Sequence, residues 1–274
     1  MKTRQLTLTA PVIRAKKGQE KIAMLTAYDH TMATLLDPYV DILLVGDTLG
    51  CVVQGGENTL SVTLEQIVYH ATQVARAAQH ALVVGDLPFG SYQLGPQQGL
   101  NSAITLVKQA GVGAVKLEGG LRSCATIEKI VDAGIPVMAH IGLTPQSIHA
   151  FGGNKVQGKQ SQQAKTLLED AKAVADAGAF ALIIEAVPET LAAEITAAID
   201  IPTIGIGAGR YCDGQVLVIN DMIGLNAKTA PMKFNKEYCQ VRELISKAVE
   251  SFAADVRQSR FPDEQHSYGL PKVS

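Results

Sequence analysis

Residues 110–118 read AGVGAVKLE, and this short stretch decides the fold. It holds an Ala-Gly pair, then an apolar run, Ala114–Leu117, and then a carboxylate, Glu118. Glycine directly after a helix is a common stop signal, because it readily adopts the left-handed backbone that ends a helix. Two more Ala-Gly pairs, Ala133-Gly134 and Ala177-Gly178, also precede apolar runs. A recurring helix end followed by a buried strand predicts alternating β and α elements.

Eight apolar runs of strand length are spaced along the chain, and segments of helical composition separate most of them. The expected strands are Ile22–Thr26, Ile42–Val45, Leu82–Gly85, Ala114–Leu117, Pro136–Ala139, Ala181–Ile184, Thr203–Ile206 and Val216–Ile219. The clearest expected helices are 63–79, 96–110, 122–133, 161–177 and 188–199. Strands that are nearly all apolar and alternate with helices indicate a parallel sheet covered by helices, and a number near eight favours a single (β/α)8 TIM-type barrel. An open doubly wound sheet is the alternative, although no G-x-G-x-x-G motif follows the first strand.

We expect one α/β barrel domain over residues 1–274, with its core at about 20–258. A short N-terminal segment precedes the core, and a polar tail, 260–274, follows it. The last expected helix, about 236–256, is amphipathic, so it should pack outside the barrel or on a neighbouring subunit.

Composition excludes several classes of protein. The 274 residues are 47% hydrophobic and 18% charged with a formal net charge of −2, which suits a large core rather than disorder or nucleic-acid binding. The four cysteines are scattered without a C-x-x-C pair, which favours free thiols in a reducing compartment. The N-terminus lacks the apolar region of a signal peptide, and no apolar run approaches the ~20 residues of a membrane helix. We expect a soluble, cytoplasmic protein with neither a membrane nor a nucleic-acid partner.

Ionisable residues follow several expected strands, at the end where barrels of this type carry their active sites. Asp47, Asp86 and Glu118 follow the second, third and fourth strands. Side chains alternate along a strand, which predicts that Leu43, Val45 and Asp47 share one face. Neighbouring strands are about 4.8 Å apart, so three carboxylates pointing inward would repel one another unless a cation lay between them. Hard oxygen ligands with open positions for water and substrate suit Mg²⁺.

Taken singly, these residues also have simpler interpretations. An Asp after a strand is often a helix cap or turn former, and Asp29 is expected to cap the first helix. A single histidine such as His140 can be a hydrogen-bonded structural residue. The remaining histidines considered, expected on the surface or in packing, are His30, His70, His80 and His149. The loop Gly205–Gly209 is interpreted as a close backbone approach to the site, with phosphate binding as a minority alternative.

Longer motifs carry a resemblance to a known family. They are Thr26-Ala27-Tyr28-Asp29, Val45-Gly46-Asp47, Val53-Gln54-Gly55, Asp86-Leu87-Pro88-Phe89, Val115-Lys116-Leu117-Glu118-Gly119-Gly120, His140-Ile141-Gly142-Leu143-Thr144-Pro145-Gln146, Gly152-Gly153-Asn154-Lys155-Val156-Gln157-Gly158 and Gly205-Ile206-Gly207-Ala208-Gly209. With these motifs in order from about Lys21 to Tyr268, the chain closely resembles the ketopantoate hydroxymethyltransferase family.

The resemblance implies a set of site residues. The family binds one Mg²⁺ per subunit at the positions of Asp47, Asp86 and Glu118. It contacts the substrate at the positions of the two aspartates, Thr48 and Lys116. Its catalytic acid/base is at the position of Glu185. We assign His140 to supporting hydrogen bonds. Two positions depart from the family pattern, Thr48 in place of Ser and Ala186 in place of a common Cys, and neither removes a charge. The family further implies a homodecamer.

The implied reaction transfers a hydroxymethyl group from 5,10-methylenetetrahydrofolate to 3-methyl-2-oxobutanoate through a Mg²⁺-stabilised enolate, giving 2-dehydropantoate for coenzyme A biosynthesis. One alternative is a lyase or mutase of the isocitrate-lyase type, but the catalytic cysteine of those barrels is absent from Lys155–Gly158. An aldolase or isomerase acting on phosphorylated substrates rests on Gly205–Gly209 alone. A binding barrel without activity would predict damaged ionisable positions.

Overall fold

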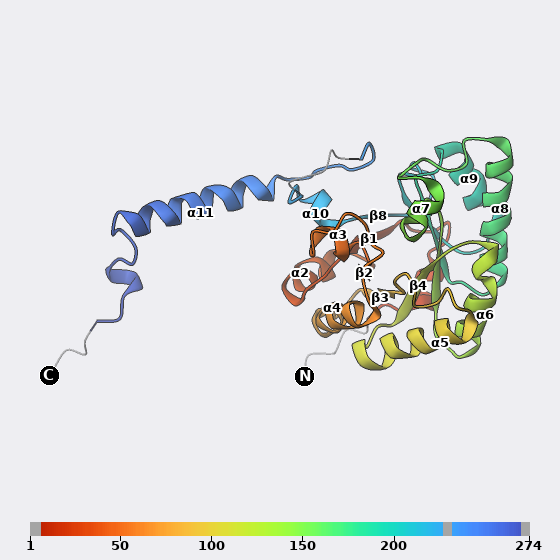
Figure 1. Cartoon of the computed structure of the whole chain (residues 1–274), viewed down its shortest axis with the longest axis horizontal. Coiled ribbons are helices and arrows are strands. Elements are labelled where there is room, and N and C mark those ends of the chain that lie inside the picture. The colour runs from red at the N-terminus through yellow and green to blue at the C-terminus, as the bar shows by residue number, and fades with distance from the viewer. Residues whose placement is uncertain (1–6, 227–231, 270–274) are drawn as a thin grey trace. The chain divides into compact units, whose positions relative to one another are not determined.

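Eight parallel strands form a closed barrel in the computed structural model, which describes residues 7–226 and 232–269 (Figure 1). Each strand pairs with the next along the chain, and the eighth pairs with the first. The strands are β1 (Ile22–Thr26), β2 (Ile42–Val45), β3 (Leu82–Asp86), β4 (Ala114–Glu118), β5 (Val137–Gly142), β6 (Ala181–Glu185), β7 (Thr203–Ile206) and β8 (Gly214–Leu217). The expected TIM-type barrel is confirmed, and the open sheet is excluded.

Helices follow most of the strands. They are α1 (Ala10–Ala15), α2 (His30–Leu36), α3 (Leu49–Val52), α4 (Leu64–Ala77), α5 (Pro96–Thr105), α6 (Cys124–Asp132), α7 (Ile148–Phe151), α8 (Ser161–Asp176), α9 (Glu189–Ala198), α10 (Ile219–Met222) and α11 (Val241–Arg257). Short turns of 3₁₀-helix lie at Asp37–Tyr39 (η1), Leu121–Ser123 (η3), Pro145–Ser147 (η4) and Glu264–His266 (η5), and α5 continues as a wider turn, Leu106–Ala110 (η2). The glycines expected to end helices, Gly111, Gly134 and Gly178, all have positive φ angles.

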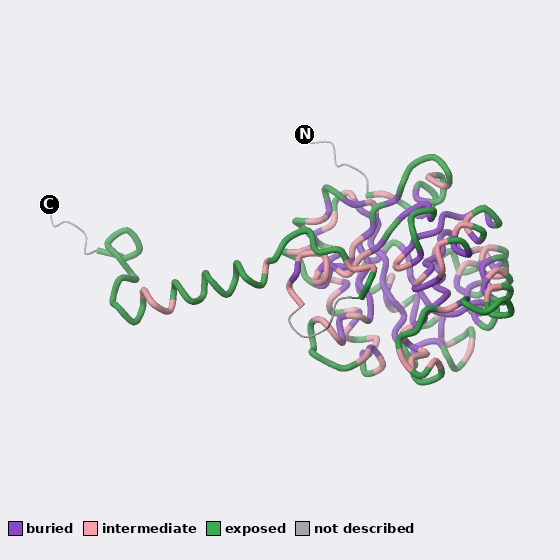
Figure 2. Tube along the Cα trace, turned by 90° about the horizontal axis from the view of Figure 1, so that it is seen from above, coloured by how far each residue is buried: buried purple, intermediate pink, exposed green. Residues whose placement is uncertain are grey.

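The barrel interior is filled by alternate residues of its strands. One buried cluster contains Ile42 and Leu44 of β2 and matching positions of the other strands: Ile22, Met24, Leu82, Val84, Ala114, Met138, Ala181, Ile183, Ile204 and Val216. Ala10 and Ile13 of α1 belong to the same cluster. The strands are coloured as buried along most of their length in Figure 2. Packed apolar layers therefore fill the barrel and leave polar chemistry to the carboxyl ends of the strands.

The eighth strand begins two residues earlier than the apolar run indicated. Gly214 pairs with Ile22 of β1 and Ile204 of β7, and a side chain there would collide with Ile22. Glycine usually weakens a strand, so composition alone argued against starting β8 at this residue. Ile219 instead opens α10, where its backbone N–H donates to the hydroxyl of Thr26.

Residues from Asn220 onward form a compact unit separate from residues up to Ile219. Its long helix, α11, begins at Val241 rather than at the expected Lys236. None of the residues of α11 is buried. The expectation of one domain over residues 1–274 remains a prediction, and residues 1–6 and 270–274 of the expected terminal segments lie outside the described residues.

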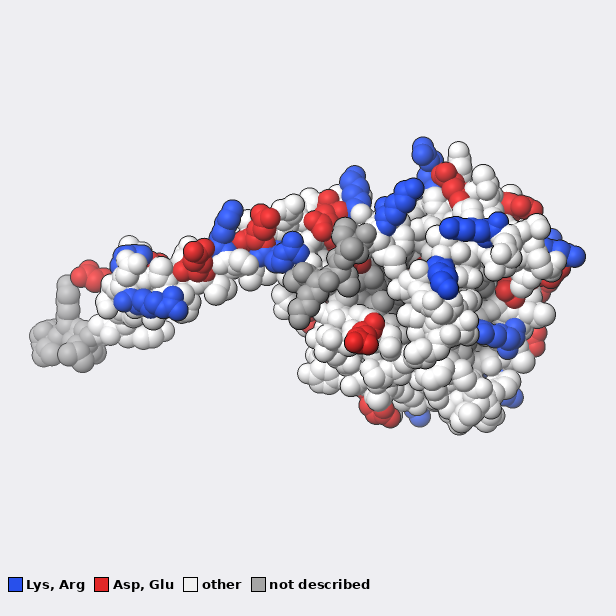
Figure 3. Space-filling model, turned by 45° about the horizontal axis from the view of Figure 1, so that its top comes forward, with Lys and Arg blue, Asp and Glu red and all other residues white. Residues whose placement is uncertain are grey.

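Charges of both signs are interspersed on the face of the barrel drawn in Figure 3. Among the described residues, no helix is long and apolar enough to cross a membrane.

Two aspartates on either side of α2 bind backbone N–H groups in different settings. Asp29 is the expected N-cap and accepts a hydrogen bond from Met32 at 2.7 Å. Asp37 is buried, and its carboxylate accepts from the N–H groups of residues 79, 80 and 81 at 2.9–3.1 Å. Asp37 thus fixes the chain entering β3 to the end of α2.

Replacing each aspartate by alanine should lower the free energy of unfolding by different amounts. Asp37→Ala leaves three buried or half-buried N–H groups without their charged acceptor and should lower the free energy of unfolding by about 3 kcal/mol. Asp29→Ala removes one exposed cap and should cost about 1 kcal/mol. Denaturant unfolding of both variants measures the difference, and equal losses would contradict the anchoring role of Asp37.

Candidate active site

One small cavity at the carboxyl ends of the strands collects every site residue expected from the sequence. Its volume is about 60 Å³. The expected residues that line it are Asp47, Thr48, Asp86, Lys116, Glu118, His140 and Glu185. Apolar side chains of Leu44, Ile183, Ile206, Val216 and Val218 complete the lining.

Strand register brings the ionisable groups together. Asp86 of β3 pairs with Lys116 of β4, and Glu118 pairs with His140 of β5. These residues share the inward parity of their strands, so their side chains point to the barrel axis. All four are buried, with at most 4% of their surface exposed. Glu185 ends β6 and is half-buried, which leaves it the most accessible of the charged groups.

Asp47 reaches the cavity by a different route from the one expected. Ile42 and Leu44 are the residues of β2 that point into the barrel, so the prediction that Leu43, Val45 and Asp47 share the inward face is wrong. Gly46 takes the next inward position, and the chain turns after it toward α3. Because Gly46 has no side chain, the carboxylate of Asp47 enters from the turn, where its N–H donates to Asp86 Oδ2 at 3.2 Å.

Lys116 is the central cation of the cavity. Its Nζ lies 2.9 Å from Asp86 Oδ2 and 3.2 Å from Glu118 Oε1. Burial would lower the pKa of Lys116, but Asp86 and Glu118 raise this pKa well above its ordinary value. The ammonium therefore stays charged. Burial raises the pKa of Glu118, but Lys116 and His140 together lower it to about 2.

His140 lies between two carboxylates. Its Nδ1 is 3.5 Å from Glu118 Oε1 and its Nε2 is 3.2 Å from Glu185 Oε2, although neither ring nitrogen has a well-aligned hydrogen bond among the described residues. Burial and Lys116 lower the pKa of His140, but the two glutamates outweigh them and raise it to about 9. At neutral pH His140 is a second cation.

Negative charge exceeds positive charge in the cavity. Four carboxylates face only the two cations Lys116 and His140, so two negative charges are unbalanced when all four carboxylates are ionised. Burial and the neighbouring Asp86 raise the pKa of Asp47 well above its usual range, and burial also raises the pKa of Asp86. Asp86 Oδ1 is buried without a hydrogen-bond partner among the described residues.

The two aspartates lie side by side, but a complete metal cage is not preformed. Within residues 7–226 and 232–269, no three or more His, Cys, Asp or Glu side chains gather closely enough to hold a metal ion by themselves.

Three hydrogen-bonding residues in or beside the site escaped sequence reasoning. Gln146 donates to Asp47 Oδ2 at 2.9 Å, and Tyr92 donates to Gln146 Oε1 at 2.6 Å. The hydroxyl groups of Tyr28 and Thr48 lie 2.9 Å apart, which gives the threonine that replaces serine a hydrogen-bond partner. Tyr28 and Gln146 stand within the motifs of the family resemblance, and that is the only signal by which they could have been found.

The backbone behind Glu185 is tightly constrained. Gly142 pairs with Glu185, and its φ of +92° is one that a side chain rarely adopts. A Cβ at Gly142 would also collide with the carbonyl oxygen of Glu185. Ala186 has a φ of +48°, and its backbone is held by hydrogen bonds from Gln157 and to Ile206. Strain of this kind persists only where the surroundings fix the backbone.

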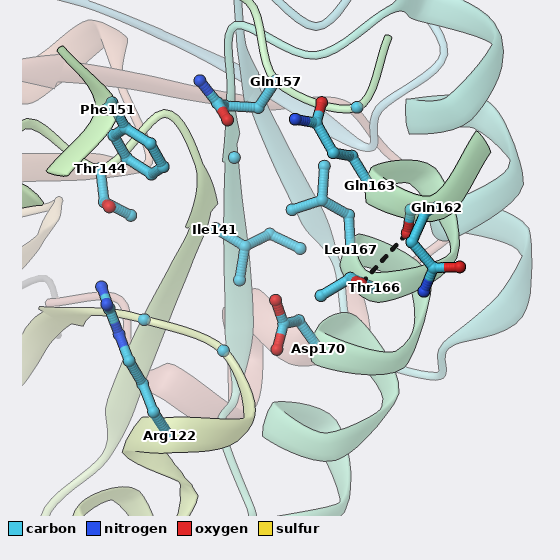
Figure 4. Close-up of a pocket in the computed structure, with 14 residues that line it drawn as sticks. Arg122, Ile141, Thr144, Phe151, Gln157, Gln162, Gln163, Thr166, Leu167 and Asp170 are labelled. Carbon is cyan, nitrogen blue, oxygen red and sulfur yellow. Dashed lines mark hydrogen bonds between the residues drawn. The ribbon is translucent and has the colours of Figure 1, made fainter. Parts of the chain in front are cut away.

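A second cavity of about 340 Å³ lies on the other side of the β4 and β5 ends. Figure 4 shows Ile141 near its centre, with Leu167, Thr166 and Asp170 projecting from α8. Gly119 and Gly120, which follow Glu118 directly, form part of its wall.

The sequence model of the ketopantoate hydroxymethyltransferase family matches residues 7–264 of this chain. The chain belongs to this family. A relative from Oleidesulfovibrio alaskensis, named 3-methyl-2-oxobutanoate hydroxymethyltransferase, is 53% identical over 97% of this chain and 92% of its own length. One of the same name from Parvibaculum lavamentivorans is 50% identical over 97% and 96%. The expectation that the protein is an enzyme of this transferase family is confirmed.

Solved structures share the hydroxymethyltransferase's fold at much lower identity. Phosphoenolpyruvate phosphomutase from Streptomyces platensis subsp. rosaceus has a TM-score of 0.61 at 16% identity, with 96% of this chain and 93% of that chain covered. A phosphonopyruvate hydrolase complex with oxalate and Mg²⁺ has a TM-score of 0.58 at 12% identity, with 94% and 93% covered. A lyase or mutase barrel is thus similar in architecture, while sequence places the chain with the transferases.

Removing the central cation of the cavity should destabilise the barrel strongly. Lys116→Met leaves Asp86 and Glu118 buried and uncompensated, which should lower the free energy of unfolding by roughly 3–5 kcal/mol. Lys16→Met is the control, because Lys16 pairs with Asp41 at 2.7 Å nearer the surface and should cost less. Thermal unfolding in metal-free buffer measures both, and comparable losses would show that Lys116 does not carry this charge balance.

Proposed function

We propose that this enzyme transfers a hydroxymethyl group from 5,10-methylenetetrahydrofolate to 3-methyl-2-oxobutanoate, giving 2-dehydropantoate and tetrahydrofolate. Water supplies the hydroxyl oxygen. Membership of the ketopantoate hydroxymethyltransferase family and the names of relatives about 50% identical over nearly the whole chain support the acceptor and product. The observation that carries the chemistry is that Glu185 shares one cavity with Asp47, Asp86 and Lys116.

The residues of the cavity fit a divalent cation. The buried, unpartnered Asp86 Oδ1 lies on a carboxylate adjacent to Asp47, and two excess negative charges match one Mg²⁺. Mg²⁺ typically uses one or two carboxylates and keeps several waters. Asp47 and Asp86 would therefore hold the ion directly, and Glu118, whose Oε1 is already held by Lys116, would support it through water. When bound, the ion would polarise the keto group and stabilise an enolate.

The charged side chains then divide the work. Lys116, which stays protonated, offsets the negative charge of the oxo acid. The hydroxyl of Thr48, already paired with Tyr28, orients the substrate. Glu185 is the general base that takes the proton from C3, and the cationic His140 at 3.2 Å holds its carboxylate in place. Both bonds that join the one-carbon unit to the folate nitrogens N5 and N10 break. The electron pair left on C3 and the oxygen of one water molecule take their places on that carbon, and the proton from C3 and one proton of the water end on the two nitrogens of tetrahydrofolate.

The folate extends beyond the cavity of about 60 Å³. A neighbouring cavity of about 390 Å³ shares Glu118 with the site cavity, and Phe89 and Tyr92 contribute aromatic surface to it. Concave space of this size next to the reacting groups supports a bulky co-substrate.

Proton exchange at C3 tests the chemistry without folate. With 3-methyl-2-oxobutanoate and Mg²⁺ in D₂O, the wild-type enzyme should exchange the C3 proton, followed by NMR. Glu185→Gln removes the base and should slow exchange roughly 10²–10⁴-fold while the oxo acid still binds. Glu189→Gln, four residues further on at the start of α9, is the matched control and should keep the wild-type rate.

The outcomes separate the roles. Undiminished exchange in Glu185→Gln would transfer the role of base to another group of the cavity. Wild-type enzyme that exchanges no proton in the presence of metal, and forms no ketopantoate when methylenetetrahydrofolate is added, would refute the proposed reaction.

We extend the proposal to a cytoplasmic homodecamer. All four cysteines lie among the described residues and are free, as a reducing compartment favours. Exposed apolar side chains recur along α11 at helical spacing: Leu244, Ile245, Val249, Phe252 and Val256. A helix with such a face needs a cover, which another copy of the chain can supply in a closed symmetric assembly.

Measurement of the mass in solution tests the assembly. Ten copies of the 29.0 kDa chain give about 290 kDa by light scattering. Phe252→Asp places a charge in the apolar face of α11 and should shift the mass toward smaller species, whereas Glu250→Gln, on the same helix, should not. A monomeric wild-type protein would contradict the assignment.

A further inference from the structure

Gln146 connects two of the site carboxylates. It lies in the 3₁₀ turn Pro145–Ser147, which follows β5. Its side-chain Nε2 donates to Asp47 Oδ2 at 2.9 Å, and its backbone N–H donates to Glu118 Oε2 at 3.0 Å. One buried residue, 5% exposed, therefore holds carboxylates that come from two different strand ends.

The orientation of the Gln146 amide is fixed by its neighbours. Nε2 also donates to the backbone carbonyl of Leu87 at 2.9 Å. A carbonyl and a carboxylate only accept hydrogen bonds, so the amide nitrogen, and not its oxygen, must face them. Oε1 is bound by the hydroxyl of Tyr92 at 2.6 Å. Burial raises the pKa of Tyr92, which keeps this hydroxyl protonated as a donor.

Tyr92 is itself locked in place. Its oxygen accepts a hydrogen bond from the N–H of Glu118 at 3.1 Å, so the chain of contacts returns to the strand end that carries a site carboxylate. The circuit runs from Asp47 through Gln146 and Tyr92 to Glu118. Every polar atom of the Gln146 side chain has a partner, and a fully satisfied buried network of this kind is rigid.

We propose that Gln146, clamped by Tyr92, is a positioning residue for the metal site. Its amide fixes Oδ2 of Asp47 and so turns the other oxygen of that carboxylate toward the cation, while its N–H fixes Glu118. The inference rests on the proposed binding of Mg²⁺ by Asp47 and Asp86. Ligand carboxylates need such partners because a freely rotating pair must be ordered when the ion binds.

Magnesium binding to the enzyme without substrate tests the inference by calorimetry. Gln146→Met keeps the size and the backbone N–H but loses the amide, and should weaken Mg²⁺ affinity roughly 10–100-fold. Gln66→Met is the matched control, because its amide oxygen caps α4 by accepting from Thr63 at 3.0 Å and touches no site residue. The control should keep the wild-type affinity, and Asp86→Asn should lose most of it.

Two further variants separate positioning from packing. Gln146→Glu has the same shape, but its carboxyl group offers at most one donor to Asp47 and Leu87, so affinity should fall at least as far as in Gln146→Met. Tyr92→Phe removes the stronger of the two donors to Gln146 Oε1, leaving Gln93 Nε2 at 3.3 Å, and should also weaken Mg²⁺ binding. This variant keeps the inference testable if a Gln146 variant does not fold. The effects of Tyr92→Phe and Gln146→Met should be far from additive, because both break one circuit.

The outcomes distinguish this inference from the proposed function. If the wild-type enzyme binds Mg²⁺ and Gln146→Met, Gln146→Glu and Tyr92→Phe bind it equally well, the positioning role is refuted alone. If Gln146→Glu binds Mg²⁺ as the wild type does and only Gln146→Met is weaker, donation by the amide nitrogen to Asp47 is not what holds the site, and the inference is also refuted. If the wild type binds no Mg²⁺, the inference fails together with the metal site.

Discussion

The ammonium of Lys116 is the group on which the rest of the site depends. It lies between the carboxylates of Asp86 and Glu118, where the fixed spacing of parallel strands brings like charges together. A buried cation among carboxylates is costly to desolvate, and its geometry must be good to offset that cost. Here the closed barrel fixes the geometry, because each strand is hydrogen-bonded on both sides. The charge balance around Lys116 therefore depends on closure of the barrel.

Lys116 does not balance the whole cavity, and this imbalance links structure to chemistry. With His140 as the second cation, carboxylates remain in excess. Burial, together with repulsion from the neighbouring carboxylates, raises the pKa values of Asp47 and Asp86. A site with excess carboxylates either binds a cation or takes up protons on its own carboxylates. The apolar layers below, closed by Ala10 and Ile13 of α1, confine this polarity to one end of the barrel.

Sequence predicted what depends on local pattern. Apolar runs and the Ala-Gly helix ends predicted the alternating elements, because burial and left-handed glycine are encoded within a few residues. The alternation of side chains along a strand failed for Asp47, because β2 ends at Val45 and the chain turns after Gly46. The start of β8 at Gly214 was missed because packing against β1 overrides the low strand propensity of glycine.

The contacts of Gln146 lay beyond such reasoning for a physical reason. Its partners Tyr92 and Asp47 are 54 and 99 residues away in the sequence, and only the closed barrel brings them within hydrogen-bonding distance. Asp47, Asp86 and Glu118 were expected together because strand ends in a barrel converge. Thr48, Lys116 and Glu185 were indicated by the family resemblance. A bridging amide in a loop has no comparable positional rule, and its polar atoms can be assigned only from their neighbours.

The left-handed backbone at Ala186 and the missing side chain at Gly142 have a consequence for anyone altering the acceptor range of this enzyme. A side chain at Gly142 would collide with the backbone of Glu185, and the backbone at Ala186 is already strained. Substitutions at these two positions would therefore displace the carboxylate of Glu185. The part of the cavity lining that comes from β8 and the residues after it, Val216 and Val218, contains no charged group. Redesign for bulkier oxo acids should begin there.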